Sequence, residues 1–187
     1  MPIRSLRLVF LLLLGACSTE AAGTSQEGDP PLRIAVASNF APTLNRIAAG
    51  FESQTGFSVS LSSGSSGKHY AQIHNGAPFD LYFAADAEHP QRLEQEGAIV
   101  PGTRTTYAIG SLALWSRDPD LVDAAGAILN TDSVRHLAIA NPDLAPYGMA
   151  AQQALQSLGL LEAWRPKLVR GENIGQVYQF THSGNAQ

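Results

Sequence analysis

Cysteine and basic residues are scarce in this sequence of 187 residues, and each scarcity excludes a class of function. Cys17 is the only cysteine, so no disulfide can form within the chain and no cluster of thiolates can hold a metal. Lysine and arginine number 12 against 16 acidic residues, which gives a formal net charge of -4. Because nucleic-acid phosphates require a clustered basic surface, the sequence predicts no nucleic-acid partner.

The motifs of common enzymes are also missing. Ser65 and Ser66 lie between glycines, but Lys68 follows Gly67, so the G-x-S-x-G spacing of a nucleophile turn is absent. The five histidines show no H-E-x-x-H spacing, and no phosphate loop or dinucleotide fingerprint is present. Three acidic residues near predicted strand ends are explained more simply as caps than as metal ligands: Asp80, Asp86 and Glu88. The sequence therefore predicts neither an enzyme nor a cofactor.

The first 17 residues have the pattern of an export signal. Arg4 and Arg7 precede the apolar run 8–14, which is too short to span a bilayer permanently. The run ends in LGAC, which resembles the bacterial lipoprotein signal, in which the cysteine, here Cys17, receives lipid and becomes the first mature residue. Residues 18–31 are rich in Ser, Gly, Glu and Pro and predict a flexible tether. We expect a periplasmic protein that meets the membrane only through this lipid anchor; an ordinary cleaved signal is the alternative.

From residue 32 onward, strand and helix patterns alternate. The apolar run 34–37 predicts a buried strand, and Ser38 and Asn39 are typical N-cap residues before an amphipathic helix that starts at Ala41. Further strand patterns cover 57–61, 80–85, 137–140 and 167–170, and further helical patterns cover 70–77, 88–96, 118–129, 149–158 and 173–180. Such alternation predicts mainly parallel sheets flanked by helices.

The apolar run 107–115 divides this pattern into two parts. Its length and its position between two sets of strand and helix predict a strand that crosses from one lobe to another. We therefore expect lobe 1 to comprise residues 32–106, and the crossing strand with lobe 2 to comprise residues 107–187. Four helix starts then gather beyond the carboxyl ends of strands, two in each lobe, where open α/β sheets hold their ligands. A single cap is usually structural, so only the joint placement of the four predicts a ligand between the lobes.

Several linked segments resemble one known family. They are IAVASNF (34–40), SSGSSGKHYAQIHNGAPFDLYFAAD (62–86), NPDLAPYGMAAQQAL (141–155) and LVRGENIGQVYQF (168–180), of which the second is the most specific. Over residues 32–187 the chain resembles the periplasmic molybdate-binding proteins, the substrate receptors of molybdate ABC importers. The resemblance implies the two-lobed periplasmic-binding-protein type II fold, with the ligand cleft between the lobes. It also implies a further segment after Gln187 that carries another tyrosine contact and a second crossing strand.

The resemblance assigns a ligand site position by position. It implies that hydroxyls and main-chain N–H groups hold the oxyanion, so that molybdenum enters only as the bound oxyanion and no side chain ligates the metal. The positions that match the family's contacts are Ser38, Asn39, Ser66, Tyr147 and Ile174. The implied partners are molybdate or tungstate, and a membrane permease with its ATPase; the receptor itself is expected to be a monomer.

The chemistry of the anion supports a site that only donates hydrogen bonds. Molybdate and tungstate are fully deprotonated at neutral pH, whereas phosphate keeps a proton that favours a carboxylate acceptor. None of the assigned positions is acidic. Sulfate also satisfies this test, so another oxyanion or a small organic anion remains the alternative ligand, and a surface lipoprotein with an unused pocket remains the alternative role. Lys68 and His69 could bring a cation near the ligand, although a solvated first turn is the simpler interpretation.

Overall fold

The computed structural model describes residues 29–187; the predicted signal and most of the predicted tether lie outside this range. No helix within it has the length and apolar character needed to cross a bilayer. The elements in chain order are β1 (Leu32–Ala37), α1 (Ala41–Thr55), β2 (Val59–Gly64), α2 (Ser66–His74), β3 (Leu81–Phe83), α3 (Glu88–Gln95), the 3-10 turn η1 (Ala127–Asn130), β4 (Leu137–Ala140), α4 (Pro146–Ser157), α5 (Leu161–Trp164), the 3-10 turn η2 (Arg165–Lys167), β5 (Leu168–Gly171) and α6 (Ile174–His182).

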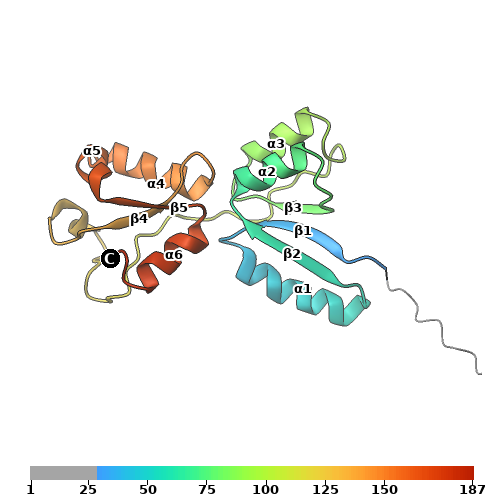
Figure 1. The fold of residues 1–187 in the computed structure, drawn as a ribbon, viewed down its shortest axis with the longest axis horizontal. Helices are drawn as coiled ribbons and strands as arrows, with labels where there is room; N and C mark the ends of the chain where they lie inside the picture. Colours follow the sequence, from blue (N-terminus) through green and yellow to red (C-terminus); the bar gives the residue numbers. More distant parts are fainter. Residues whose placement is uncertain (1–28) are drawn as a thin grey trace, which may run out of the picture.

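These elements form two α/β lobes that lie side by side (Figure 1). The N-terminal lobe is built on three parallel strands in the order β2-β1-β3, and the C-terminal lobe on the parallel pair β4 and β5. In Figure 1, α1 covers one face of the first sheet and α2 and α3 the other, while α6 lies opposite α4 and α5 across the second sheet. The predicted two-lobed α/β architecture is confirmed.

Strand β1 is the centre of the N-terminal lobe. It pairs with β2 on one side and β3 on the other, and its residues from Ile34 to Ala37 are all buried. A strand that is covered on both faces needs a continuous apolar run rather than an alternating one, which is what this segment supplies. Ile34 and Val36 pack against Ala41 and Leu44 of α1, so the helix is fixed directly behind the carboxyl end of β1.

The C-terminal lobe has its own core around Trp164. The Trp164 ring packs with Val134 and Leu155, and its Nε1 donates a hydrogen bond to the Leu129 carbonyl at 3.0 Å. A buried indole N–H that finds a partner costs little, so the ring can contribute its full apolar area to the core. Leu155 belongs to the last turn of α4, so this core holds the C-terminal end of that helix, whereas Ala145, directly before its first turn, packs with Ala140 and Val177 in a separate cluster.

The helix predicted over residues 118–129 is not formed. Turns occupy most of this stretch, and only η1 is helical. Asp118 accepts from the Asp120 N–H at 3.0 Å and Asp123 from the Ala127 N–H at 2.9 Å, so the side chains satisfy local backbone groups in place of a helix. The left-handed Gly126 (φ 65°) interrupts the segment further.

The run 107–115 crosses between the lobes, as predicted, but it is not a strand within the described chain. Tyr107 packs against Phe40 and Phe83 of the N-terminal lobe and donates to the Ala84 carbonyl at 2.8 Å. Trp115 stacks on Tyr178 of α6 at 5.0 Å. No described strand pairs with the run, and an extended segment without a neighbour has no ladder of hydrogen bonds. Apolar residues alone did not distinguish a strand from an extended connection.

Candidate functional site

The site lies where the strands of both lobes end. In the N-terminal lobe, Ala37 pairs with Gly64, and the next residue, Ser38, donates its N–H to the Gly64 carbonyl at 2.9 Å. The C-terminal lobe repeats this arrangement, because Asn141 donates its N–H to the Gly171 carbonyl at 2.7 Å. Parallel strands therefore end in register in each lobe, and the helix starts that follow them face one another across the seam (Figure 1).

One small pocket is enclosed by these helix starts. Its cavity volume is about 10 Å³, close to the space that one water molecule needs. The pocket contains all five residues assigned from the sequence. Its lining consists of Ala37, Ser38, Asn39, Gly64, Ser65, Ser66 and Ala85 from the N-terminal lobe and Ala145, Pro146, Tyr147, Asn173 and Ile174 from the C-terminal lobe.

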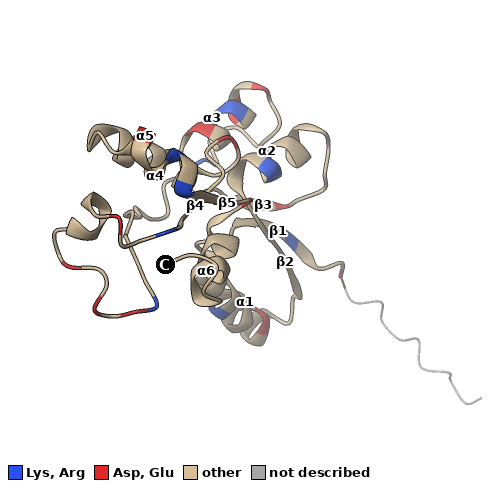
Figure 2. Cartoon of the chain, turned by 60° about the vertical axis from the view of Figure 1, so that its left-hand side comes forward, with Lys and Arg blue, Asp and Glu red and all other residues tan. Residues whose placement is uncertain are grey.

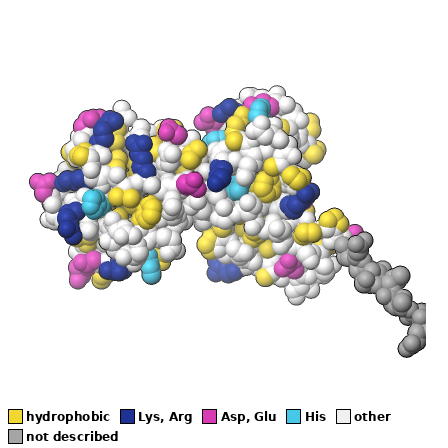
Figure 3. Space-filling model, viewed as in Figure 1, with side chains coloured by type: hydrophobic (Ala, Val, Ile, Leu, Met, Phe, Trp, Pro, Cys, Tyr) yellow, Lys and Arg dark blue, Asp and Glu magenta, His cyan; other side chains and the backbone are white. Residues whose placement is uncertain are grey.

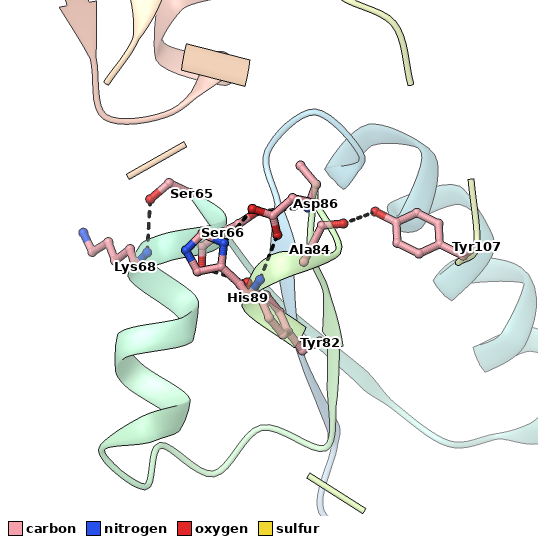
Figure 4. Close-up of polar contacts among 9 residues, drawn as sticks. Ser65, Ser66, Lys68, Tyr82, Ala84, Asp86, His89 and Tyr107 are labelled. Carbon is pink, nitrogen blue, oxygen red and sulfur yellow. Dashed lines mark hydrogen bonds and ion pairs between the residues drawn. The ribbon is translucent and has the colours of Figure 1, made fainter. Parts of the chain in front are cut away.

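Ser66 opens α2 and is fully buried. Its Oγ accepts a hydrogen bond from the Ala85 N–H at 2.9 Å, and its carbonyl accepts from the Tyr82 hydroxyl at 2.8 Å (Figure 4). Burial raises the pKa of Tyr82, so this hydroxyl stays protonated and keeps donating. The Ser66 oxygen accepts from a backbone donor, and its hydroxyl proton is still available to donate to a ligand in the pocket.

Ser38 lies in the turn between β1 and α1 and makes the corresponding contact from the other side. Its Oγ accepts from the Gly175 N–H at 3.1 Å, a hydrogen bond that joins the N-terminal lobe to the first turn of α6. The expectation that Ser38 and Asn39 cap α1 is wrong, because the N-cap is Phe40 and no side chain caps the helix. The turn instead places the Ser38 hydroxyl at the seam, with its proton available as a donor.

The C-terminal lobe contributes two helix starts. Ala145 is the N-cap of α4, so Pro146 and Tyr147 stand in its first turn rather than before it. Asn173 is the N-cap of α6, as predicted, and its side chain accepts from the Gln176 N–H at 3.1 Å, directly before Ile174. The first N–H groups of a helix have no partner within the helix and carry a partial positive charge. Both starts therefore favour a bound anion.

The pocket lining contains no Asp, Glu, Lys, Arg or His. Among the described residues no three His, Cys, Asp or Glu side chains gather as a metal site. Lysines and arginines are spread over both lobes rather than gathered on the face of Figure 2 or Figure 3. Hydroxyls and backbone N–H groups are thus the chemistry of the pocket, which suits an anion that only accepts hydrogen bonds.

Lys68 and His69 differ from each other in their surroundings. The Lys68 side chain is about half exposed, which agrees with a solvated first turn, and pairs with Glu172. His69 is buried with 2% exposure, so the same interpretation is wrong for it. Burial lowers the pKa of His69, and the Nδ1 hydrogen bond to Gln72 at 3.0 Å offsets this only in part. Neither residue lines the pocket.

The buried His69 predicts a loss of stability in acid. The unfolded chain protonates this ring near pH 6.5, whereas the folded chain keeps it neutral to lower pH, so acidification below pH 6.5 favours the unfolded state. We expect His69→Leu to lose less unfolding free energy between pH 7.5 and 5.5 than the unsubstituted protein, by up to about 1 kcal/mol. Urea unfolding measures this, with the exposed His136→Gln as control. Equal pH dependence in all three proteins would contradict the prediction.

Some contacts could not be found from the sequence. The Ala85 N–H that orients Ser66 and the Gly175 N–H that orients Ser38 belong to small residues without a distinguishing side chain. Asn173 was predicted as a cap but not as part of the pocket. Only the closeness of separate segments in space reveals these roles.

The two lobes, the crossing segment and the pocket between opposed helix starts define a two-lobed solute-binding protein. The model of the bacterial extracellular solute-binding protein family matches residues 32–187. The chain belongs to this family. The comparisons therefore confirm the expectation of a binding protein rather than an enzyme.

Comparison with individual relatives gives a more specific result than the family model. The molybdate-binding protein ModA of Azotobacter vinelandii is 48% identical over 183 residues, which cover 97% of this chain and 69% of the relative. ModA of Rhodobacter capsulatus is 45% identical, with 94% and 66% covered. The solved structure of the Azotobacter vinelandii periplasmic molybdate-binding protein superposes with a TM-score of 0.81 at 47% identity, covering 83% of this chain and 68% of that one. The chain thus spans about two thirds of the length of these relatives.

Proposed function

We propose that this protein captures molybdate, and tungstate as its chemical analogue, in the periplasm and delivers it to an ABC importer. The names of the relatives that share nearly half of its residues support molybdate as the ligand. The observation that carries the proposal is the pocket itself, in which donors from both lobes converge and no carboxylate is present. A carboxylate would serve protonated phosphate and would repel a dianion.

The bound anion would bridge the lobes. Ser38 and Ser66 would donate their hydroxyl protons, Asn39 would donate its N–H, and the N–H groups of Tyr147 and Ile174 would donate from the other side. Because these contacts form together only when the lobes meet, the ligand favours the closed arrangement. The closed protein, a monomer held to the membrane by lipid on Cys17, would then dock on the permease that an ATPase drives.

Removal of the Ser66 hydroxyl tests this assignment. We expect Ser66→Ala to weaken molybdate binding by about 1.5 to 3 kcal/mol, the contribution of a hydrogen bond to a charged group. Calorimetric titration measures the change in affinity, with Ser60→Ala, on the exposed side of β2, as a matched control. An unchanged affinity in Ser66→Ala would remove this residue from the site.

Thermal unfolding separates the alternatives. A ligand that binds only the folded state raises the melting temperature, by an amount that grows with its concentration relative to its dissociation constant. Molybdate and tungstate are expected to stabilise the protein at concentrations where sulfate, phosphate and small carboxylates do not. Stabilisation by an organic anion alone would favour the alternative ligand class, and no response to any anion would favour a lipoprotein with an unused pocket.

A further inference from the structure

Beside the pocket, the two lobes touch at a second place that does not line it. Gly67, in the first turn of α2, donates its N–H to the Leu144 carbonyl of the C-terminal lobe at 2.9 Å. The next residue, Lys68, reaches across the same seam to Glu172, with 3.7 Å between Nζ and Oε2. We call these four residues the inter-lobe clasp. Figure 4 shows Lys68 projecting from the start of α2, away from the buried Ser66.

A glycine is needed at position 67 because of the close backbone of the other lobe, and not because of its own backbone conformation. Its φ is not positive, so an alanine could adopt the same helical conformation. A Cβ at this position, however, would lie 2.9 Å from the Leu144 carbonyl oxygen and 3.3 Å from the Leu144 Cα. Both atoms are backbone of the other lobe and cannot rotate away. The lobes can therefore approach this closely only because residue 67 has no side chain.

The Lys68 and Glu172 pair adds charge to the same contact. The two side chains are 54% and 65% exposed, so the attraction between them is screened by solvent and small. It exists only when the lobes are together, because Lys68 belongs to α2 and Glu172 to the turn between β5 and α6. A weak contact of this kind shifts an equilibrium between open and closed lobes without contacting the ligand.

We propose that the inter-lobe clasp sets the affinity for the anion, with Gly67 and Lys68 acting as positioning residues for closure. The inference rests on the proposed function, since it concerns how firmly the same pocket closes. Disruption of the clasp leaves every pocket donor in place and makes the closed state less populated. The anion then leaves faster, and its apparent dissociation constant rises in inverse proportion to the closed fraction that remains.

Gly67→Ala is the most direct test. We expect its molybdate dissociation constant to rise about tenfold to a hundredfold, because the added Cβ keeps the lobes apart. The melting temperature of the ligand-free protein should not fall, because alanine favours the helix. The control is Gly50→Ala in α1, where a Cβ meets no atom within 4 Å and binding should be unchanged. Unchanged molybdate affinity in Gly67→Ala would overturn the proposal, and so would a fall in melting temperature that accounts for the lost binding.

Substitutions of Lys68 and Glu172 test whether the pair acts on binding through lobe closure or through the electrostatic field at the anion. If Lys68 and Glu172 act only through the field at the dianion, Lys68→Met weakens molybdate binding and Glu172→Gln strengthens it. The clasp instead predicts that each single variant weakens binding, by about 1.5- to fivefold, and that the exchange Lys68→Glu with Glu172→Lys restores it. Tighter binding by Glu172→Gln would contradict the clasp. If the unsubstituted protein binds no molybdate, the proposed function is wrong. If it binds molybdate and the variants bind equally well, the proposed function stands and only the clasp is wrong.

Discussion

Replacement of Ser38 by aspartate is expected to abolish molybdate binding. At 4 Å and an effective dielectric constant of 20, two unit charges of one sign repel by about 4 kcal/mol, and a dianion doubles this figure. The Asp carboxylate could still accept from the Gly175 N–H that Ser38 now binds at 3.1 Å, so the seam between the lobes need not be disrupted. We therefore expect the affinity measured by calorimetric titration to fall by more than about a thousandfold.

Ser38→Asn separates charge from size in this experiment. The amide is close in shape to the carboxylate and can also accept from Gly175, but it carries no charge. Its affinity should remain far closer to that of the unsubstituted protein than to that of Ser38→Asp. Binding by Ser38→Asp within tenfold of the unsubstituted protein would mean that the anion does not lie beside residue 38.

The second large effect concerns folding, at Gly148 in the first turn of α4. A Cβ there would lie 2.6 Å from the carbonyl carbon of Ala140 and 2.8 Å from that of Asn141, at the end of β4. These are backbone atoms of the C-terminal sheet, so α4 would have to move off the sheet. We expect Gly148→Ala to lower the free energy of unfolding by about 3 kcal/mol or more, as severe overpacking does.

Urea unfolding of the ligand-free protein measures this loss. Gly50→Ala is again the matched control, because it adds the same methyl group to a helix with open space around it, and it should be neutral or stabilising by up to about 1 kcal/mol. An unfolding midpoint for Gly148→Ala equal to that of the control would show that α4 tolerates displacement from β4. The position of Tyr147, one residue earlier, would then be less fixed than the structure indicates.

One element in each lobe shows how far sequence patterns reach. The buried strand that ends at Ala37 and the Asn173 cap of α6 follow from local chemistry, namely an apolar run and an N-cap preference. Because parallel strands end at one edge of a sheet, the order of these elements also predicted that the helix starts would meet. The five pocket residues were assigned by resemblance to a family, and their joint position agrees with that topology.

What sequence patterns missed depends on tertiary contacts. Local periodicity made 107–115 a strand, but a strand exists only with a paired neighbour, and none is found among the described residues. The helix predicted to begin at Asp118 or Asp120 failed because Asp side chains bind nearby N–H groups as readily as they cap. His69 looked solvated because its burial depends on tertiary contacts, with Gly64 at the end of β2 against its ring and the Phe79 and Tyr82 rings beside it. The clasp between Gly67 and Leu144 likewise joins two lobes that no local pattern relates.

Calorimetric titration of the purified protein with molybdate, tungstate, sulfate and phosphate tests the central claim most directly. A pocket of hydroxyls and N–H groups without a carboxylate predicts binding of molybdate and tungstate at concentrations where phosphate gives no heat; the sulfate titration measures selectivity among fully deprotonated dianions, which the donor set alone does not determine. Phosphate binding in preference to molybdate, or the absence of any heat from molybdate and tungstate, would contradict the account.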